Sequence, residues 1–149
     1  MKRAPGMTLL ELLIVLAIFA IVTGIGVING RQVAQRQAAR GAVATFQQSV
    51  WQGATAAASR GLTVELHWSA GKLSLVDVDS ERVLREYDVP KDVTVNAANP
   101  ILRFTPPGKV DLETLDALPD QLVVDTSAGR YELQISLIGE VKAAPLGDG

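Results

Sequence analysis

Few residues of this 149-residue chain have both the type and the spacing that chemistry requires. The sequence contains no cysteine, so it can form neither a disulfide framework nor a thiolate metal site. Its single histidine, His67, alternates with Thr63 and Glu65 on the polar side of a predicted strand. A hydrolytic site needs a nucleophile, a base and an orienting group together. We therefore interpret His67 as a surface residue and expect no catalytic residues and no enzyme.

Three acids stand at alternate positions in the segment DVDSER, at Asp77, Asp79 and Glu81. Their carboxylate oxygens are of the type that binds calcium. The segment lacks the glycine and the distal glutamate of an EF-hand loop, however. A solvated turn between two strands is the simpler interpretation, and we expect neither a metal nor a cofactor.

The remaining candidate is a carboxylate in an apolar environment. Glu11 interrupts the apolar run from Met7 to Ile28, which as a helix would span roughly 33 Å against a hydrocarbon core of about 30 Å. We therefore expect a transmembrane helix over residues 7–28. A carboxylate inside lipid costs about 2.5–3.5 kcal/mol, and less near the interface. Glu11 should therefore have a cationic partner.

Two other interpretations of this run remain open. A helix buried in a soluble protein would rarely need so many consecutive apolar residues. A conventional secretory signal peptide, with Lys2 and Arg3 as its positive region, would release a secreted β-domain. It leaves Glu11 unexplained and requires an apolar core about twice the usual length.

Residues 29–60 continue the helical pattern in amphipathic form. Apolar residues recur there at steps of three and four, at Val43, Phe46, Val50, Ala54 and Ala57. Glycines at positions 24, 26, 30 and 41 predict kinks or local unwinding, and Gly61 is a candidate C-terminal cap. Arg31, Arg36 and Arg40 form a basic patch that suits a solvated face, lipid headgroups, neighbouring subunits or DNA.

Residues 61–149 form an acidic, β-rich head domain. They contain 15 acidic and 8 basic residues. Alternating patterns predict strands at 62–68, 73–78, 83–89, 93–97, 101–105, 121–126 and 130–137. Asp111 should cap a short helix at 112–118, and the segment APLGDG should be a frayed end. The predicted fold class is α+β, with a long N-terminal helix packed on an antiparallel β-sheet head.

The segment PGMTLLELL resembles the leader junction of type IV pilins and type II secretion pseudopilins. In that junction a short basic leader ends in glycine, and the fifth mature residue is glutamate. Gly6 matches the last leader residue, Glu11 the fifth mature residue, and Met7 the first, where the family usually has Phe. The resemblance implies that residues 1–6 are a leader, that a prepilin peptidase cuts between Gly6 and Met7, and that Met7 is N-methylated.

The same resemblance implies a role for Glu11 and a set of partners. Glu11 would pair with the α-amine of a neighbouring subunit during assembly, although the amine of the same chain, one helical turn away, is an alternative. The partners would be other pilins or pseudopilins through the N-terminal helix, the prepilin peptidase, an inner-membrane assembly platform and the lipid bilayer. The chain would cross the bacterial inner membrane once, with a cytoplasmic N-terminus and a periplasmic head, before it joins an extracytoplasmic filament.

Three later segments resemble the GspH/FimT group of minor pseudopilins and minor pilins. They are QGATAAASRGLTVEL with Gly61, RFTPPGKV with Phe104, Pro106 and Gly108, and the final strand ISLIGEV with Gly139. The resemblance implies a minor subunit that joins or primes a type II secretion pseudopilus or a type IV pilus.

A DNA-binding minor pilin of natural transformation is the alternative function. The DNA-binding members are expected to carry arginines near the last strand, whereas here Glu140 follows the glycine and Lys142 is the nearby cation. Phosphate binding needs clustered Lys or Arg. We therefore do not expect nucleic acid as a partner.

Overall fold

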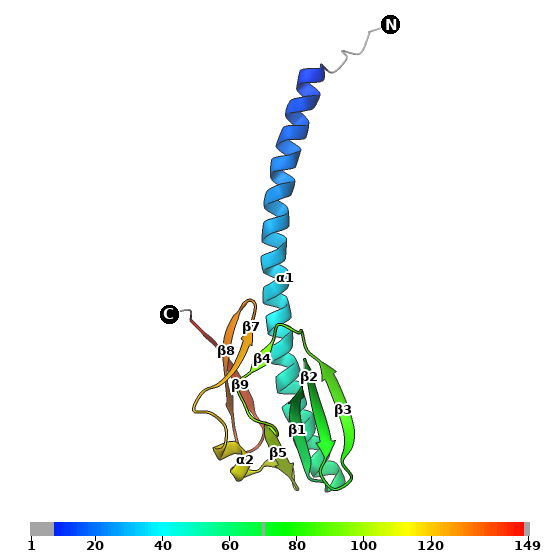
Figure 1. Ribbon diagram of the computed structural model, residues 1–149, viewed down its shortest axis with the longest axis vertical. Coiled ribbons are helices and arrows are strands. Elements are labelled where there is room, and N and C mark those ends of the chain that lie inside the picture. The colour runs from blue at the N-terminus through cyan, green and yellow to red at the C-terminus, as the bar shows by residue number, and fades with distance from the viewer. Residues whose placement is uncertain (1–7, 70, 148–149) are drawn as a thin grey trace. The chain divides into compact units, whose positions relative to one another are not determined.

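The computed structural model describes residues 8–69 and 71–147, without the side chains of residues 25–29. The chain divides into two compact units, Met1–Gln35 and Arg36–Gly149, which we describe separately. Helix α1 (Leu9–Arg60) begins in the first unit and ends in the second. The second unit also holds every strand and a short helix (Figure 1).

Helix α1 confirms the long N-terminal helix. It continues without a break through Gly24, Gly30 and Gly41, so the expected local unwinding does not occur. A glycine costs a helix only about 0.5–1 kcal/mol relative to alanine, which the neighbouring helix-forming residues offset. Gly61 ends the helix as predicted: its φ is 67°, and its N–H donates to the Ala57 carbonyl at 3.0 Å.

The strands of the second unit form two antiparallel sheets. The first sheet has the order β3-β2-β1-β5-β6, and the second has the order β4-β7-β8-β9. The strands of the first sheet are β1 (Val64–Ser69), β2 (Lys72–Asp77), β3 (Arg82–Asp88), β5 (Leu102–Thr105) and β6 (Lys109–Val110). Those of the second are β4 (Thr94–Val95), β7 (Leu122–Thr126), β8 (Gly129–Ile135) and β9 (Val141–Leu146). The α+β class is confirmed, and it is consistent with a pilin-like fold.

The short helix α2 (Leu112–Asp116) lies between β6 and β7. The carboxylate of Asp111 accepts a hydrogen bond from the Glu113 N–H at 2.9 Å, which confirms Asp111 as its cap.

The C-terminal part of the head differs from the expectation. Strand β8 ends at Ile135, and the segment interpreted as a final strand is a turn in which the Ser136 N–H donates to the Glu140 carbonyl at 2.9 Å. The last strand, β9, includes Ala144 to Leu146, which we expected to be frayed. Those residues have little intrinsic β propensity. Their pairing with β8 decides their structure.

The free edge of β9 is closed at two points. The backbone hydrogen bonds of an antiparallel pair alternate between the partner strand and the free edge. Since the Ser136 N–H donates to the Glu140 carbonyl, the backbone groups of Val141, Ala143 and Pro145 point to the free edge, away from β8. The Val141 carbonyl accepts a hydrogen bond from Nε2 of Gln47 on α1 at 3.1 Å. Pro145 has no N–H to offer. An additional strand would therefore find few partners at this edge.

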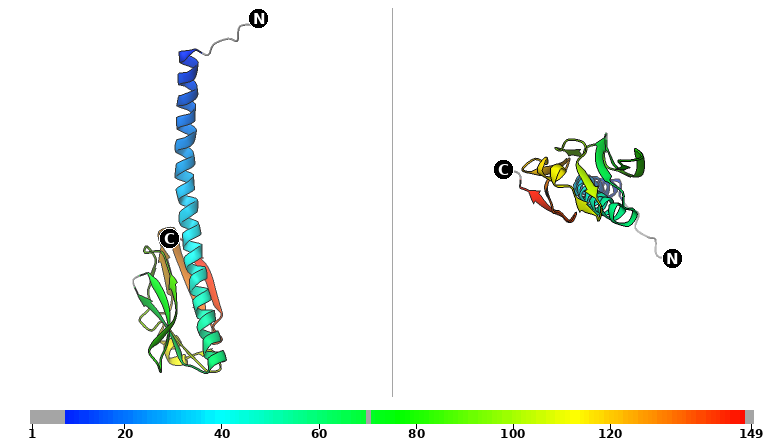
Figure 2. Two further views of the ribbon diagram at one scale, coloured as in Figure 1. Left: turned by 90° about the vertical axis from the view of Figure 1, so that its right-hand side faces the viewer. Right: turned by 90° about the horizontal axis from the view of Figure 1, so that it is seen from below.

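The core of the second unit lies between the C-terminal part of α1 and the two sheets. Figures 1 and 2 show this part of α1, in cyan, beside both the green strands and the orange-to-red strands. The predicted apolar stripe is buried at Val43, Phe46, Val50 and Ala57, whereas Ala54 is half-buried. The largest fully buried side chains of the sheets are Leu66, Leu73, Leu75, Leu102 and Phe104, together with Ile101 next to β5.

Candidate processing and assembly site

The predicted cleavage junction between Gly6 and Met7 lies outside the described residues. The description begins with Thr8, immediately after it. The geometry of the site is therefore that of the first helical turn.

Thr8 caps helix α1. Its hydroxyl oxygen accepts a hydrogen bond from the Glu11 N–H at 3.2 Å, and its carbonyl accepts one from the Leu12 N–H at 3.1 Å. These are the two bonds of an N-cap residue. Sequence reasoning missed Thr8, although a threonine directly before an apolar helical run is a favoured N-cap residue that could have identified it.

The carboxylate of Glu11 is exposed in this first turn. An acid is favourable there because the N-terminal end of a helix carries a partial positive charge. Among the described residues, no hydrogen bond or ion pair involves this carboxylate. Since the Thr8 hydroxyl caps the helix, the Glu11 carboxylate can accept a cation from elsewhere.

Large apolar side chains cover α1 on all sides after this turn. Leu13 is 61% exposed, Phe19 is 69% exposed and Val22 is 63% exposed. Val15, Ile18, Phe19 and Val22 border a shallow apolar hollow of about 300 Å³. Such a surface needs an apolar neighbour.

Of the helices in the described part of the chain, none has the combination of length and apolarity that crossing a membrane requires. The span predicted over residues 7–28 includes Met7, which lies outside the described residues, and it stays a prediction.

The structure brings three residues of the GspH/FimT-like segments to one face of α1. A Cβ at Gly53 would overlap the ring of Phe104, and one at Gly108 would lie 2.7 Å from the Ala54 carbonyl oxygen. A Cβ at Gly139 would lie 3.4 Å from Cβ of Ala54. Gly108 and Gly139 also have positive φ values of 97° and 77°. Glycine thus allows both turns to approach the helix.

The remaining two residues of those segments have separate positions. Gly61 caps α1, and Pro106 lies between β5 and β6, two residues before Gly108. Sequence reasoning missed that Gly53 and Ala54 contact these residues of the head. It could not find these contacts, because the partners lie far away in the sequence.

Glu65 forms the centre of a charged group on β1 and β5. Its carboxylate accepts hydrogen bonds from Nη2 and Nε of Arg103 at 2.7 and 2.9 Å, and it lies 3.0 Å from Nε2 of His67. Partial burial raises the pKa of Glu65, but the hydrogen bonds and charges of Arg103 and His67 outweigh it, so this pKa lies below the ordinary 4.5. His67 thus contacts a carboxylate on its own strand, which agrees with a structural position.

The Glu65→Gln variant should change the acid stability of the head. With its pKa lowered in the folded state, Glu65 stabilises the fold above its unfolded pKa, and this contribution is lost as the pH falls through the folded pKa. We expect the variant to be less stable by roughly 1 kcal/mol at neutral pH. Thermal melts of the full chain in mild detergent should show this difference shrinking below about pH 4.5. A constant difference down to strongly acidic pH would contradict this assignment.

The acidic segment at residues 77–82 forms a turn. Asp77 is buried, and its carboxylate accepts hydrogen bonds from the Asp79 N–H at 3.2 Å and the Ser80 hydroxyl at 2.6 Å. Within the described ranges, no group of three acidic, histidine or cysteine side chains is arranged to hold a metal ion. The expected absence of a metal stays a prediction.

The comparison with protein families concerns the N-terminal part of the chain. Residues 1–27 match the family model of the prokaryotic N-terminal methylation motif. The chain carries this methylation motif. The matched range includes Gly6, Met7 and Glu11, and the match supports a type IV pilin family member that a prepilin peptidase processes. No curated protein and no solved structure matches the chain significantly.

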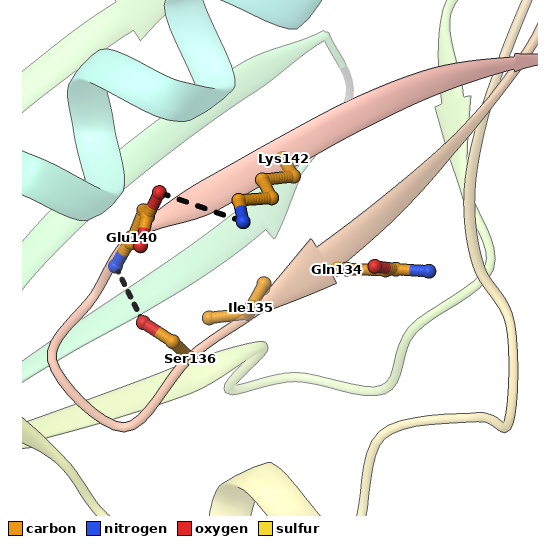
Figure 3. A pocket seen from close by; sticks show the side chains of 5 residues that line it. All are labelled: Gln134, Ile135, Ser136, Glu140 and Lys142. Carbon is orange, nitrogen blue, oxygen red and sulfur yellow. Dashed lines mark hydrogen bonds and ion pairs between the residues drawn. The ribbon is translucent and has the colours of Figure 1, made fainter.

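The turn between β8 and β9 is where the DNA-binding alternative would need clustered arginines. In this pilin-like chain the charges there are mixed. Figure 3 shows a surface pocket of about 240 Å³ lined by Gln134, Ile135, Ser136, Glu140 and Lys142. Nζ of Lys142 lies 4.0 Å from Oε1 of Glu140, whose N–H donates to the Ser136 hydroxyl at 3.0 Å. A lone lysine beside a carboxylate offers a phosphate little attraction. That nucleic acid is not a partner stays a prediction.

Proposed function

We propose that this chain is a minor pseudopilin or minor pilin of the GspH/FimT type. A prepilin peptidase removes residues 1–6 and methylates Met7, and the mature chain joins or primes a type II secretion pseudopilus or a type IV pilus. The observation that carries the proposal is the methylation motif over residues 1–27.

The first turn of α1 supports the assembly role. The Glu11 carboxylate is exposed, and the helix cap does not require it because the Thr8 hydroxyl accepts the Glu11 N–H. Cleavage before Met7 creates an α-amine with an ordinary pKa near 8, which is mostly cationic at neutral pH. An amine on a neighbouring subunit is a suitable partner for this carboxylate.

The head supports the finer assignment to the GspH/FimT type. Phe104, Gly108 and Gly139, which carry that resemblance, all lie against Gly53 and Ala54 of α1. These residues therefore hold the strands and turns of the head on the helix. This is a packing role, which suits residues shared by a group of structural subunits.

The proposed role is structural, not catalytic. The hydrogen bond of 3.0 Å between Nε2 of His67 and Oε2 of Glu65 gives the half-buried histidine a place among the polar contacts of β1. The partners in this proposal are other pilins or pseudopilins, the prepilin peptidase and an inner-membrane assembly platform. The methylation motif suggests anchoring at the inner membrane before the chain enters an extracytoplasmic filament.

Intact mass of the mature protein tests the processing. We expect a chain that begins at methylated Met7 after co-expression with a prepilin peptidase, and the uncut chain when the peptidase is absent. Replacement of Gly6 by a bulky residue should prevent the cut. A mature chain that begins near residues 24–30 would instead indicate an ordinary signal peptidase and would overturn the proposal.

A further inference from the structure

We propose that Arg36 and Arg40 of α1 form a binding site for the phosphate groups of anionic phospholipids. Both arginines lie in the second unit, directly after the boundary at Gln35. This inference rests on the proposed function, in which the chain is anchored at the inner membrane, and it adds a class of lipid and the residues that recognise it.

Arg36 and Arg40 are exposed cations without an acidic neighbour on their helix. Every residue from 30 to 38 is exposed, and so is Arg40, whereas Ala39 between them is buried. Within the described residues, no ion pair involves either guanidinium. Glu11 is the one acid in the sequence of α1. Both guanidinium groups are therefore available to an anion from outside the chain.

The spacing of the two arginines suits a phosphate group. Residues four positions apart lie on the same side of a helix, with their Cβ atoms about 5–6 Å apart. Two like charges at this spacing repel each other and weaken the helix slightly. An anion bound between them would remove that repulsion. Guanidinium groups also form paired hydrogen bonds with phosphate oxygens, whereas a lysine acts as a point charge.

The position of the arginines in the sequence favours lipid as the source of the phosphate. Arg36 and Arg40 follow the end of the apolar run at Ile28 by 8 and 12 positions. Basic residues within about 15–20 residues of a membrane span oppose the transfer of the following segment across the membrane. An anionic lipid surface on that side would offset this cost. Arg31, which is exposed in the first unit, adds a third arginine to the same stretch of sequence.

The acids of the head are concentrated away from these arginines. The turn at residues 77–82 contains three acids, and the segment at residues 111–120, which includes α2, contains four. Figure 1 shows the β2–β3 turn and α2 at the end of the second unit where α1 ends. The Val78 N–H donates to the Thr63 carbonyl at 3.0 Å, which holds the acidic turn close to that end of the helix. An anionic surface would be repelled there and attracted at the arginine end.

Native mass spectrometry of the full chain tests the lipid preference. The chain is purified in mild detergent and mixed with equal amounts of phosphatidylglycerol and phosphatidylcholine, whose acyl chains are identical. We expect adducts with phosphatidylglycerol to exceed those with phosphatidylcholine roughly twentyfold, the effect of two basic residues at an anionic surface. Arg36→Gln combined with Arg40→Gln should bring the ratio of the two adducts close to one. A ratio close to one in the unchanged chain would overturn the inference.

Two further variants separate the site from a general effect of charge. Arg60→Gln removes the same charge from an exposed position at the other end of α1, so it should leave the adduct ratio unchanged. Arg36→Lys combined with Arg40→Lys should give an intermediate ratio, because the charges remain while the paired hydrogen bonds are lost. An equal loss in Arg60→Gln and in the double glutamine variant would contradict a site at Arg36 and Arg40.

Two other sources of an anion give different outcomes. A short DNA duplex, added at the same concentration of phosphate, should leave the phosphatidylglycerol adducts in place. Their displacement by the duplex would overturn the inference in favour of nucleic acid. If the double glutamine variant kept its adduct ratio but lost co-recovery with partner pilins, the occupant would be an acidic face of another subunit, and the inference would again be overturned.

The outcomes also separate this inference from the proposed function. Cleavage before Met7, measured by intact mass, requires neither arginine. Normal cleavage without a lipid preference would therefore overturn the inference alone. A mature chain that begins near residues 24–30 would remove the proposed function, and with it the membrane anchor on which the inference rests, whatever the adduct ratio.

Discussion

The Phe104→Ala variant is expected to lose about 3–5 kcal/mol of unfolding free energy, the range found when a buried phenylalanine is truncated. Phe104 is fully buried on β5, and its ring lies against Gly53 of α1. The truncation therefore opens a cavity between the first sheet and the helix. Urea unfolding of the full chain in mild detergent, followed by near-UV circular dichroism, measures the loss.

Gly53 provides a matched test of the same contact. Gly53→Ala alone should cost roughly 1–3 kcal/mol, because its Cβ would overlap the buried ring of Phe104, which would have to shift. In the Phe104→Ala background the cost should fall, since the obstructing ring is gone. Gly41→Ala is the control: nothing lies within 4 Å of its Cβ position, so alanine should stabilise the helix by up to about 1 kcal/mol. Additive effects of Gly53→Ala and Phe104→Ala would contradict the proposed packing.

The Glu11→Ala variant should separate processing from assembly. We expect cleavage before Met7 and methylation to continue, because the motif's glycine junction is intact. Recovery with partner pilins should fall roughly tenfold or more, since a charge-assisted hydrogen bond contributes about 1.5–3 kcal/mol. Intact mass measures the processing, and co-purification from detergent extracts, quantified against total protein, measures the assembly.

Two variants sharpen this result. Glu11→Gln keeps the size of the side chain but removes its charge, so it should lose assembly almost as fully as Glu11→Ala. Ser59→Ala changes an exposed polar residue in the last turn of α1 and provides the control for a nonspecific effect on the helix. Undiminished co-purification of Glu11→Ala would refute the assembly role.

Much of the fold could be predicted because its signals are local. The spacing of Val43, Phe46 and Val50 predicted which side of α1 is buried, and Gly61 marked its end. Alternation from Val64 to Trp68 predicted β1, and Asp111 marked the start of α2. In each case the residues that specify the element belong to it or adjoin it.

The remainder depends on contacts between distant segments. Strand β9 contains two alanines and a proline and becomes a strand through its pairing with β8. The sequence predicted an antiparallel β-sheet head, but no local pattern records that its strands divide into two sheets. Gly53 illustrates the same limit: only the position of the Phe104 ring shows why this helical residue has no side chain.

The candidate site was predictable to a similar degree. The motif itself identifies Gly6, Met7 and Glu11 as a processing and assembly set, and the family match covers them. The helix cap at Thr8 could also have been predicted, because a threonine directly before an apolar helical run is a favoured N-cap residue. The sequence alone could not show that the Glu11 carboxylate is available to bind a cation. That depends on which group caps the helix, and the structure shows that it is the Thr8 hydroxyl.

The closed edge of β9 has a consequence for contacts between heads. An open strand edge can pair with the edge of another copy and join two heads through one continuous sheet. With the Val141 carbonyl engaged by Gln47 and a proline further along, this border resists such growth. Any contact between heads across this border is then left to side chains.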